Sequence, residues 1–106
     1  MRRGEIWTLR DKQYASKSRP VIIVQSDECM SFDSVILCLF TSYESNDIET
    51  RVLVVASEDN GLVKDSYVMT DKIVTVDRRM LGERIGHISE DEMTIVSEKL
   101  KVILGL

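Results

Sequence analysis

The sequence predicts an α+β domain, or a small twisted β-barrel covered by a helix, because the hydrophobic period changes once along the chain. Short β-branched runs bounded by turn residues fill most of the first 88 positions and indicate strands. Apolar residues at helical spacing occupy the last part of the chain. Short strands followed by one helix are typical of this class. The 106 residues fit a single domain, 1–106.

The predicted strands share β-branched residues and turn chemistry at their ends. Residues 5–9 alternate polar and apolar side chains, as a half-buried strand does. Residues 20–25 indicate a central strand that begins with proline, and residues 34–40 form a second apolar run. Further extended segments are expected at 51–55, 66–70, 72–76 and 84–88, where 66–70 and 72–76 are two strands or one bent strand.

A helix is expected from about Glu90 to Leu104. Ser89 and Glu92 have the spacing of a capping box, in which each side chain bonds the other residue's backbone N–H. The apolar residues that follow at helical spacing are Met93, Val96, Leu100, Ile103 and Leu104.

Composition narrows the class of protein. An apolar fraction of 43% and a charged fraction of 30% argue against a disordered or low-complexity chain. No run approaches the roughly 20 apolar residues of a membrane span, and no signal-peptide core follows the N-terminus. We therefore expect a cytoplasmic protein with no membrane partner. Cys29 and Cys38 agree with that compartment and are expected to be buried small hydrophobes, and His87 is expected to be structural.

The net charge of −4 hides an uneven distribution. Residues 1–20 hold six basic and two acidic side chains, whereas residues 26–70 hold nine acidic and two basic ones. Because local charge sets the potential of a groove, an acidic protein can still have a basic groove. Solvated surface charge accounts for the same pattern equally well.

The motifs that are absent restrict the chemistry. The sequence has no phosphate-binding loop of the Walker type and no glycine-rich dinucleotide fingerprint. The two cysteines lack zinc-knuckle spacing, and a single histidine cannot build a histidine-rich metal site. We therefore expect chemistry without metal or cofactor, carried by Arg, Thr, Ser, Asp, Lys or Tyr.

Short stretches at 3–7, 18–24, 40–42, 61–68, 72–77 and 84–86 stand in a characteristic order along nearly the whole chain. Together they resemble the MazF/PemK family, the endoribonuclease toxins (mRNA interferases) of bacterial type II toxin–antitoxin systems. The resemblance implies an SH3-like barrel with a C-terminal helix that works as a homodimer. It also implies sequence-specific, metal-independent cleavage of single-stranded mRNA by the ribose 2′-OH, which leaves a 2′,3′-cyclic phosphate and a 5′-OH. A cognate antitoxin would block the groove with a disordered segment that folds on binding.

The resemblance implies two catalytic residues. Arg19 matches the family's catalytic arginine, and a guanidinium suits the negative charge that builds on phosphate oxygens. Thr41 matches the catalytic threonine, whose hydroxyl can donate to the same phosphate. Candidates for the base that accepts the 2′-OH proton are Asp71, which aligns with an acid of one branch of the family, and Asp77, which equally fits a turn former or a partner of Arg78.

Further side chains are expected to contact the RNA strand: Lys17, Ser18, Ser42, Arg78 and Arg79, with Tyr14 as the base-stacking residue and Trp7 as core or dimer interface. The chain departs from the family in a shorter loop at 10–18 and in Val74 and Met80, where the family has arginines. Two other functions stay open. One is a CcdB-like inhibitor of DNA gyrase on the same fold, and the other is an inactive relative that only binds an antitoxin or RNA.

Overall fold

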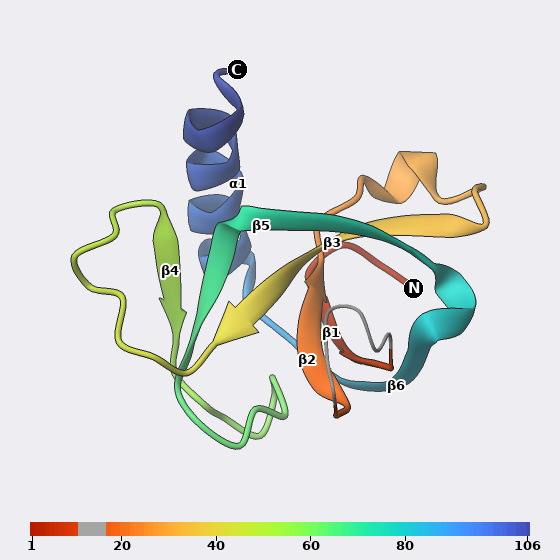
Figure 1. Cartoon of the computed structure of the whole chain (residues 1–106), viewed down its shortest axis with the longest axis horizontal. Helices are drawn as coiled ribbons and strands as arrows, with labels where there is room; N and C mark the ends of the chain where they lie inside the picture. Colours follow the sequence, from red (N-terminus) through yellow and green to blue (C-terminus); the bar gives the residue numbers. More distant parts are fainter. Residues whose placement is uncertain (11–16) are drawn as a thin grey trace.

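The computed structural model describes residues 1–10 and 17–106, which form one strongly twisted antiparallel sheet and a helix (Figure 1). The strands are β1 Glu5–Leu9, β2 Arg19–Ile23, β3 Ser34–Thr41, β4 Arg51–Val54, β5 Ser66–Asp77 and β6 Leu81–His87. Two short 3₁₀ turns are η1 Asp27–Cys29 and η2 Arg78–Met80, and the helix α1 is Glu90–Leu104.

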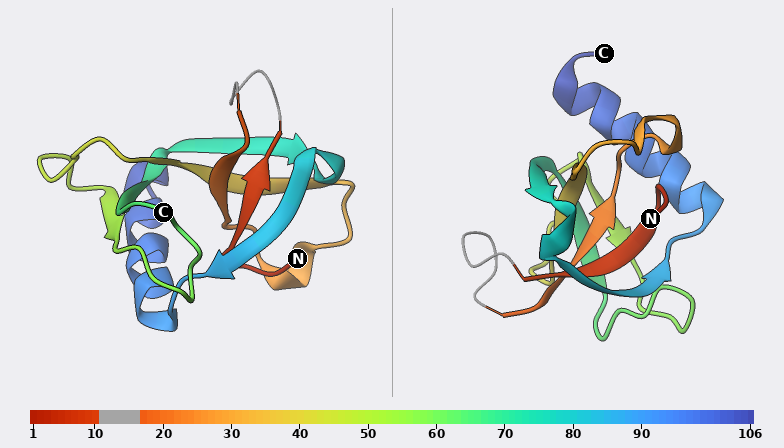
Figure 2. Two further views of the ribbon diagram at one scale, coloured as in Figure 1. Left: turned by 90° about the horizontal axis from the view of Figure 1, so that it is seen from below. Right: turned by 90° about the vertical axis from the view of Figure 1, so that its right-hand side faces the viewer.

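The strand order is β4-β5-β3-β2-β1-β6, and every neighbouring pair is antiparallel. The segments 66–70 and 72–76 belong to the one long strand β5, which pairs with β4 through its first residues and with β3 along most of its length. A register shift between Cys38 and Leu39 marks where β3 and β5 bend. The sheet curls without pairing its edges, β4 and β6, so the predicted small twisted barrel is confirmed as a barrel-like open sheet (Figure 2).

The helix α1 has the predicted bounds because both of its ends are capped locally. The Ser89 Oγ accepts a hydrogen bond from the Glu92 N–H at 3.1 Å, and the Glu92 carboxylate accepts one from the Ser89 N–H at 2.9 Å. Gly105 ends the helix in the left-handed conformation, at φ 71°. None of the helices in the described chain is long and apolar enough to cross a membrane.

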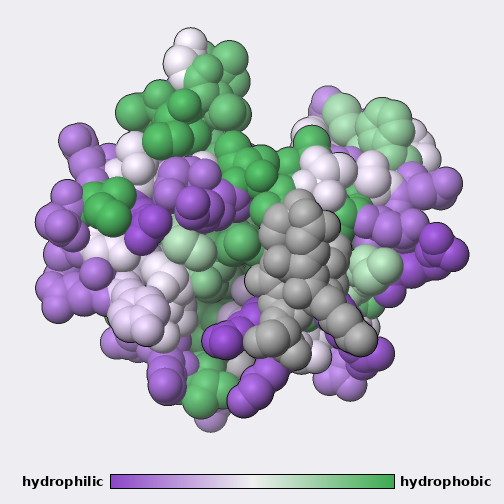
Figure 3. Space-filling model, in the orientation of Figure 1, coloured by the Kyte–Doolittle hydropathy of each residue, from purple (hydrophilic) through white to green (hydrophobic). Residues whose placement is uncertain are grey.

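Two apolar clusters hold the sheet. One lies between the sheet and α1 and includes Ile6, Ile22, Val68, Val96 and Leu100. The other contains Leu9, Val21, Ile23, Val35, Leu37, Val76 and Leu81. The outer end of α1 is left uncovered, and apolar side chains gather on its surface (Figure 3).

The cysteine prediction is half right. Cys38 is fully buried in β3, and this burial raises the pKa of its thiol to about 12. Cys29 is exposed, because η1 is a surface turn without a buried residue. The strand predicted at 84–88 begins earlier, at Leu81, directly after η2.

Candidate functional site

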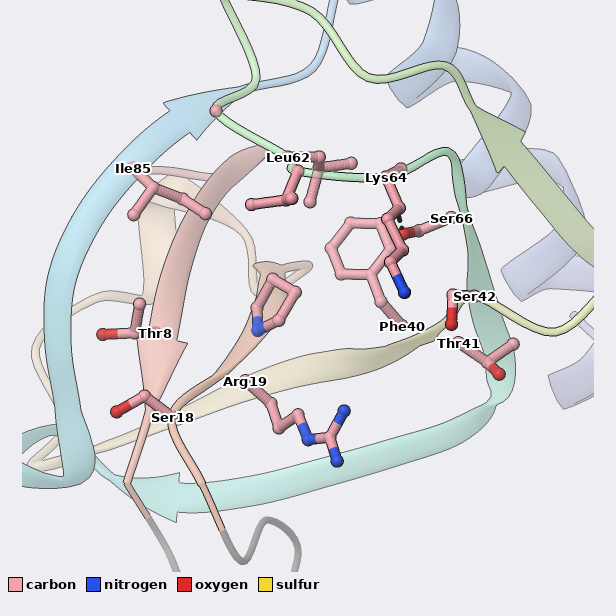
Figure 4. Close-up of a pocket in the computed structure, with 13 residues that line it drawn as sticks. Thr8, Ser18, Arg19, Phe40, Thr41, Ser42, Leu62, Lys64, Ser66 and Ile85 are labelled. Carbon is pink, nitrogen blue, oxygen red and sulfur yellow. Dashed lines mark hydrogen bonds between the residues drawn. The ribbon is translucent and has the colours of Figure 1, made fainter.

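A cleft of about 420 Å³ opens between β2, the end of β3 and the segment that leads into β5 (Figure 4). Its polar lining consists of Thr8, Ser18, Arg19, Thr41, Ser42, Lys64 and Ser66. Its apolar lining consists of Pro20, Phe40, Leu62, Val63 and Ile85, together with Gly61. Four of the residues predicted from the sequence therefore line one cleft: Arg19, Thr41, Ser18 and Ser42.

Arg19 enters the cleft from the first position of β2, where it pairs with Leu9 of β1. Figure 4 shows its guanidinium extending from β2 toward the end of β3. Within residues 1–10 and 17–106, the guanidinium has no carboxylate partner. Among these residues, no carboxylate competes for it with an anion in the cleft.

Thr41 is the last residue of β3, and its backbone pairs with Tyr67 of β5. Its Oγ1 accepts a hydrogen bond of 3.2 Å from the Tyr43 N–H. That bond orients the side chain and leaves the hydroxyl hydrogen to donate to a ligand. The end of β3 thus places a neutral hydrogen-bond donor in the same cleft as the positively charged Arg19.

Lys64 and the apolar wall are members of this cleft that the sequence analysis missed. Lys64 is one of two basic residues in the acidic stretch 26–70, and that isolation was the available signal. Phe40 ends the predicted apolar run 34–40, and in the structure it is half-buried and lines the cleft together with Pro20. The cleft therefore joins a polar, cationic part to an apolar part.

Asp71 does not line this cleft. Its carboxylate is bound by the guanidinium of Arg51 at two points, Nη2–Oδ2 at 3.1 Å and Nε–Oδ1 at 3.2 Å. These hydrogen bonds hold the pKa of the Asp71 carboxyl below its ordinary value. They also raise the pKa of Arg51, so each group stabilises the charged form of the other.

Asp77 lies at the far end of β5 and caps η2. Its carboxylate accepts a hydrogen bond of 2.9 Å from the Arg79 N–H and forms an ion pair of 2.9 Å with the Arg79 Nη2. Arg79 thereby lowers the pKa of the Asp77 carboxyl. Arg78 donates from Nη1 to the backbone oxygens of Met30 and Phe32. None of these three side chains lines the cleft.

The remaining predicted residues fall outside the cleft or outside the described chain. Lys17 is exposed next to Ser18 but does not line the cleft. Tyr14 lies outside the described residues. Trp7 is half-buried, packs against the second apolar cluster and donates from Nε1 to Glu5 at 3.1 Å. In the described ranges, no group of three or more His, Cys, Asp or Glu side chains could hold a metal ion.

Comparison with known proteins gives consistent matches over the whole chain. A family model described as PemK-like, MazF-like toxin of type II toxin–antitoxin system matches residues 2–104. The probable endoribonuclease MazF of Mycolicibacterium smegmatis is 35% identical over 107 aligned positions, which cover 100% of this chain and 98% of that protein.

Solved structures share the fold at lower identity. The Mycobacterium tuberculosis toxin MazF-mt6 superposes with a TM-score of 0.82 at 24% identity, covering 96% of this chain and 97% of that one. A mycobacterial endoribonuclease in complex with its cognate antitoxin gives 0.83 at 22% identity, with coverages of 100% and 96%. A MazE–MazF structure from Deinococcus radiodurans gives 0.80 at 18% identity, again covering 100% and 96%. These superpositions confirm the predicted fold class.

Proposed function

Because this chain belongs to the family of PemK-like, MazF-like toxins of type II toxin–antitoxin systems, we propose that it is an endoribonuclease that cleaves single-stranded mRNA at a specific sequence. The observation that carries the proposal is the presence of Arg19 and Thr41 in one cleft. The 35% identity to a probable endoribonuclease MazF supports it.

The proposed reaction is an internal transesterification that needs no metal. The ribose 2′-oxygen forms a bond to the adjacent phosphorus, and the bond from phosphorus to the 5′-oxygen of the next nucleotide breaks. The 2′-OH loses its proton and the leaving 5′-oxygen gains one, which gives a 2′,3′-cyclic phosphate and a 5′-OH. Arg19 and the Thr41 hydroxyl stabilise the charge that builds on the non-bridging oxygens, and removing one such donor costs about 3–4 kcal/mol.

The group that accepts the 2′-OH proton is a separate question. No carboxylate occurs among the described residues that line the cleft. Asp71 and Asp77 both have lowered pKa values, which makes a carboxylate a weaker base. Their role as general bases stays a prediction that substitution can test.

The apolar lining suits an unpaired nucleobase. Single-stranded RNA is recognised by splayed bases that stack on aromatic side chains, and stacking tolerates any base because each has a π-face. Phe40 offers such a face in the same cleft as Arg19, and Leu62 and Ile85 add to the apolar surface. Ser18 and Ser42 supply hydroxyls that contact the strand. We also assign strand contacts to Tyr14, Lys17, Arg78 and Arg79.

The proposal includes two protein partners and a compartment. A cognate antitoxin would cover the cleft with a segment that folds on binding, in line with the similar structures that contain an antitoxin. A second copy of the chain would cover apolar side chains at the end of α1, where Val102, Leu104 and Leu106 are 67%, 55% and 87% exposed. An mRNA substrate places the protein in the cytoplasm.

The test is incubation of the purified protein with a defined transcript in EDTA, followed by mapping of the cut sites and their end groups. We expect discrete cuts with cyclic phosphate ends, and Arg19→Ala and Thr41→Ala should each lower the cleavage rate by about 10²–10³-fold. Intact RNA together with trapped gyrase–DNA complexes would replace the proposal with the gyrase-inhibitor function. Intact RNA without such complexes would leave a protein that only binds.

A further inference from the structure

Lys64 brings a second cation to the cleft from a different part of the chain than Arg19. It lies on the segment between β4 and β5, two residues before Ser66. Figure 4 shows its amino group directed past Phe40 toward Ser42. Arg19 reaches the same space from β2, so the two cations approach from separate walls.

No carboxylate neutralises these two cations in the part of the chain that the structure describes. None of the ion pairs there includes Lys64 or Arg19, and the described lining of the cleft contains no acid. The neighbouring Asp65 is engaged elsewhere, because its Oδ1 accepts a hydrogen bond of 2.8 Å from the Ala56 N–H. Two cations on the lining of one cleft give it a positive local potential that favours an anion, although the net charge of the chain is −4.

Asn60, a polar residue that is only 3% exposed, holds the backbone on the N-terminal side of Lys64. Its Oδ1 accepts hydrogen bonds of 3.0 Å from the Ser57 and Leu62 N–H groups, and its Nδ2 donates to the Val55 oxygen at 2.8 Å. The segment therefore holds its shape before any ligand arrives, which is the arrangement expected for preorganised charge stabilisation.

Two further contacts fix the same backbone. Gly61 has φ +69°, and a Cβ on it would collide with the carbonyl oxygen of Ile85 in β6. On the other side of Lys64, the Ser66 Oγ donates to the Lys64 oxygen at 3.0 Å. These contacts hold the backbone on both sides of Lys64, whose exposed side chain lines the cleft.

We propose that the Lys64 ammonium binds the scissile phosphate of the RNA, on the side opposite Arg19. This inference rests on the proposed endoribonuclease function. A lysine acts as a compact point charge with three donors, whereas arginine presents a planar pair of donors. The two together neutralise both non-bridging oxygens while the Thr41 hydroxyl donates to one of them.

The test measures single-turnover cleavage of a short RNA that carries a cut site mapped with the wild-type protein. Lys64→Gln should slow cleavage by about 100-fold, the lower part of the range for one lost charge-stabilising donor. Lys64→Arg should restore most of the rate, which a merely structural role would not require. The matched control, Lys101→Gln, removes the same charge from an exposed position on α1 and should leave the rate unchanged.

Binding of a short, uniformly 2′-O-methylated RNA provides a readout that does not depend on cleavage. Loss of one phosphate contact to a single strand should reduce the slope of log affinity against log salt by about 0.7. Lys64→Gln should show this reduction, and Lys101→Gln should keep the wild-type slope.

The outcomes separate this inference from the proposed function. If the wild-type protein cleaves and Lys64→Gln keeps either the wild-type rate or the wild-type salt slope, the phosphate contact is refuted and the endoribonuclease stands. If the wild-type protein cuts no RNA, the proposed function fails. The salt slope then still decides whether Lys64 meets a phosphate, since an unchanged slope refutes it and a reduced slope supports it.

Discussion

Charged side chains occur both in the cleft and along β5 beyond Ser66, but the two regions differ in whether these side chains form ion pairs. Asp71 and Asp77 are paired with Arg51 and Arg79. In the cleft, by contrast, Arg19 has no carboxylate partner among the described residues. Paired ions satisfy one another and stabilise the fold slightly, whereas an unpaired cation is left for a ligand. A cation in this molecule therefore points to a ligand site where it lines the cleft and has no carboxylate partner among the described residues.

The largest effect is expected from the removal of Arg19, which has no carboxylate partner among the described residues. Arg19→Ala should lower the cleavage rate by 10²–10³-fold, roughly 3–4 kcal/mol of transition-state stabilisation. Its thermal unfolding midpoint should stay near that of the wild type, because Arg19 is exposed. Arg2→Ala, at the exposed N-terminus outside the cleft, is the matched control and should cleave normally. Equal losses in both variants would show that net charge matters rather than position.

An intermediate effect is expected from the residue that holds the Lys64 segment. Asn60→Ala leaves the Ser57 and Leu62 N–H groups and the Val55 oxygen without their partner. The free energy of unfolding should fall by about 1–3 kcal/mol, measured by urea denaturation. Glu58→Ala, exposed in the same segment, should change it by less than about 0.5 kcal/mol. Equal stability of the two variants would contradict the anchoring role of Asn60.

The smallest effect is expected for the ion pair between Arg51 and Asp71. A double-mutant cycle with Arg51→Met and Asp71→Asn should give a coupling of about 0.2–1 kcal/mol, because the pair is partly exposed to solvent. The pair lowers the pKa of folded Asp71 below 3.8. Its contribution to stability is therefore complete above pH 3.8 and is lost as the pH falls through the lowered pKa.

The same Asp71→Asn variant also tests the general-base prediction. If the carboxylate acts only as the partner of Arg51, cleavage should stay within a few-fold of the wild-type rate. A loss of 100-fold or more, with stability little changed, would instead make Asp71 part of the catalytic machinery. That result would break the division between paired and unpaired charges.

The sequence predicted those parts of the fold that local interactions determine. The bounds of α1 follow from a capping box at its start and an apolar stripe along it. Both patterns are local, because they lie within the helix and its N-cap. The strands follow from β-branched runs, but whether 66–77 forms one strand depends on its pairing with β3 and β4. The burial of Cys29 was predicted wrongly, because a single residue type says little about a surface turn.

The sequence predicted a residue of the site only where that residue belongs to a motif of the family. The resemblance to the family predicted Arg19 and Thr41. No local pattern could place them in one cleft, because that depends on the non-local pairing of β2 with β3. The bond between Arg51 and Asp71 joins residues 20 positions apart, so it needs the register of β4 on β5. Lys64 reaches the cleft because its segment packs against β6, and no local pattern encodes that contact.

The close packing of two glycines sets how this surface can diversify. A side chain at Gly61 would strike Ile85, and one at Gly86 would strike Asp59 and Asn60, so neither position tolerates a larger residue. Residues 62–64 follow immediately and face the cleft on a backbone that those contacts immobilise. Substitutions at 62–64 therefore exchange chemical groups in the cleft while the two glycine contacts keep the backbone in place.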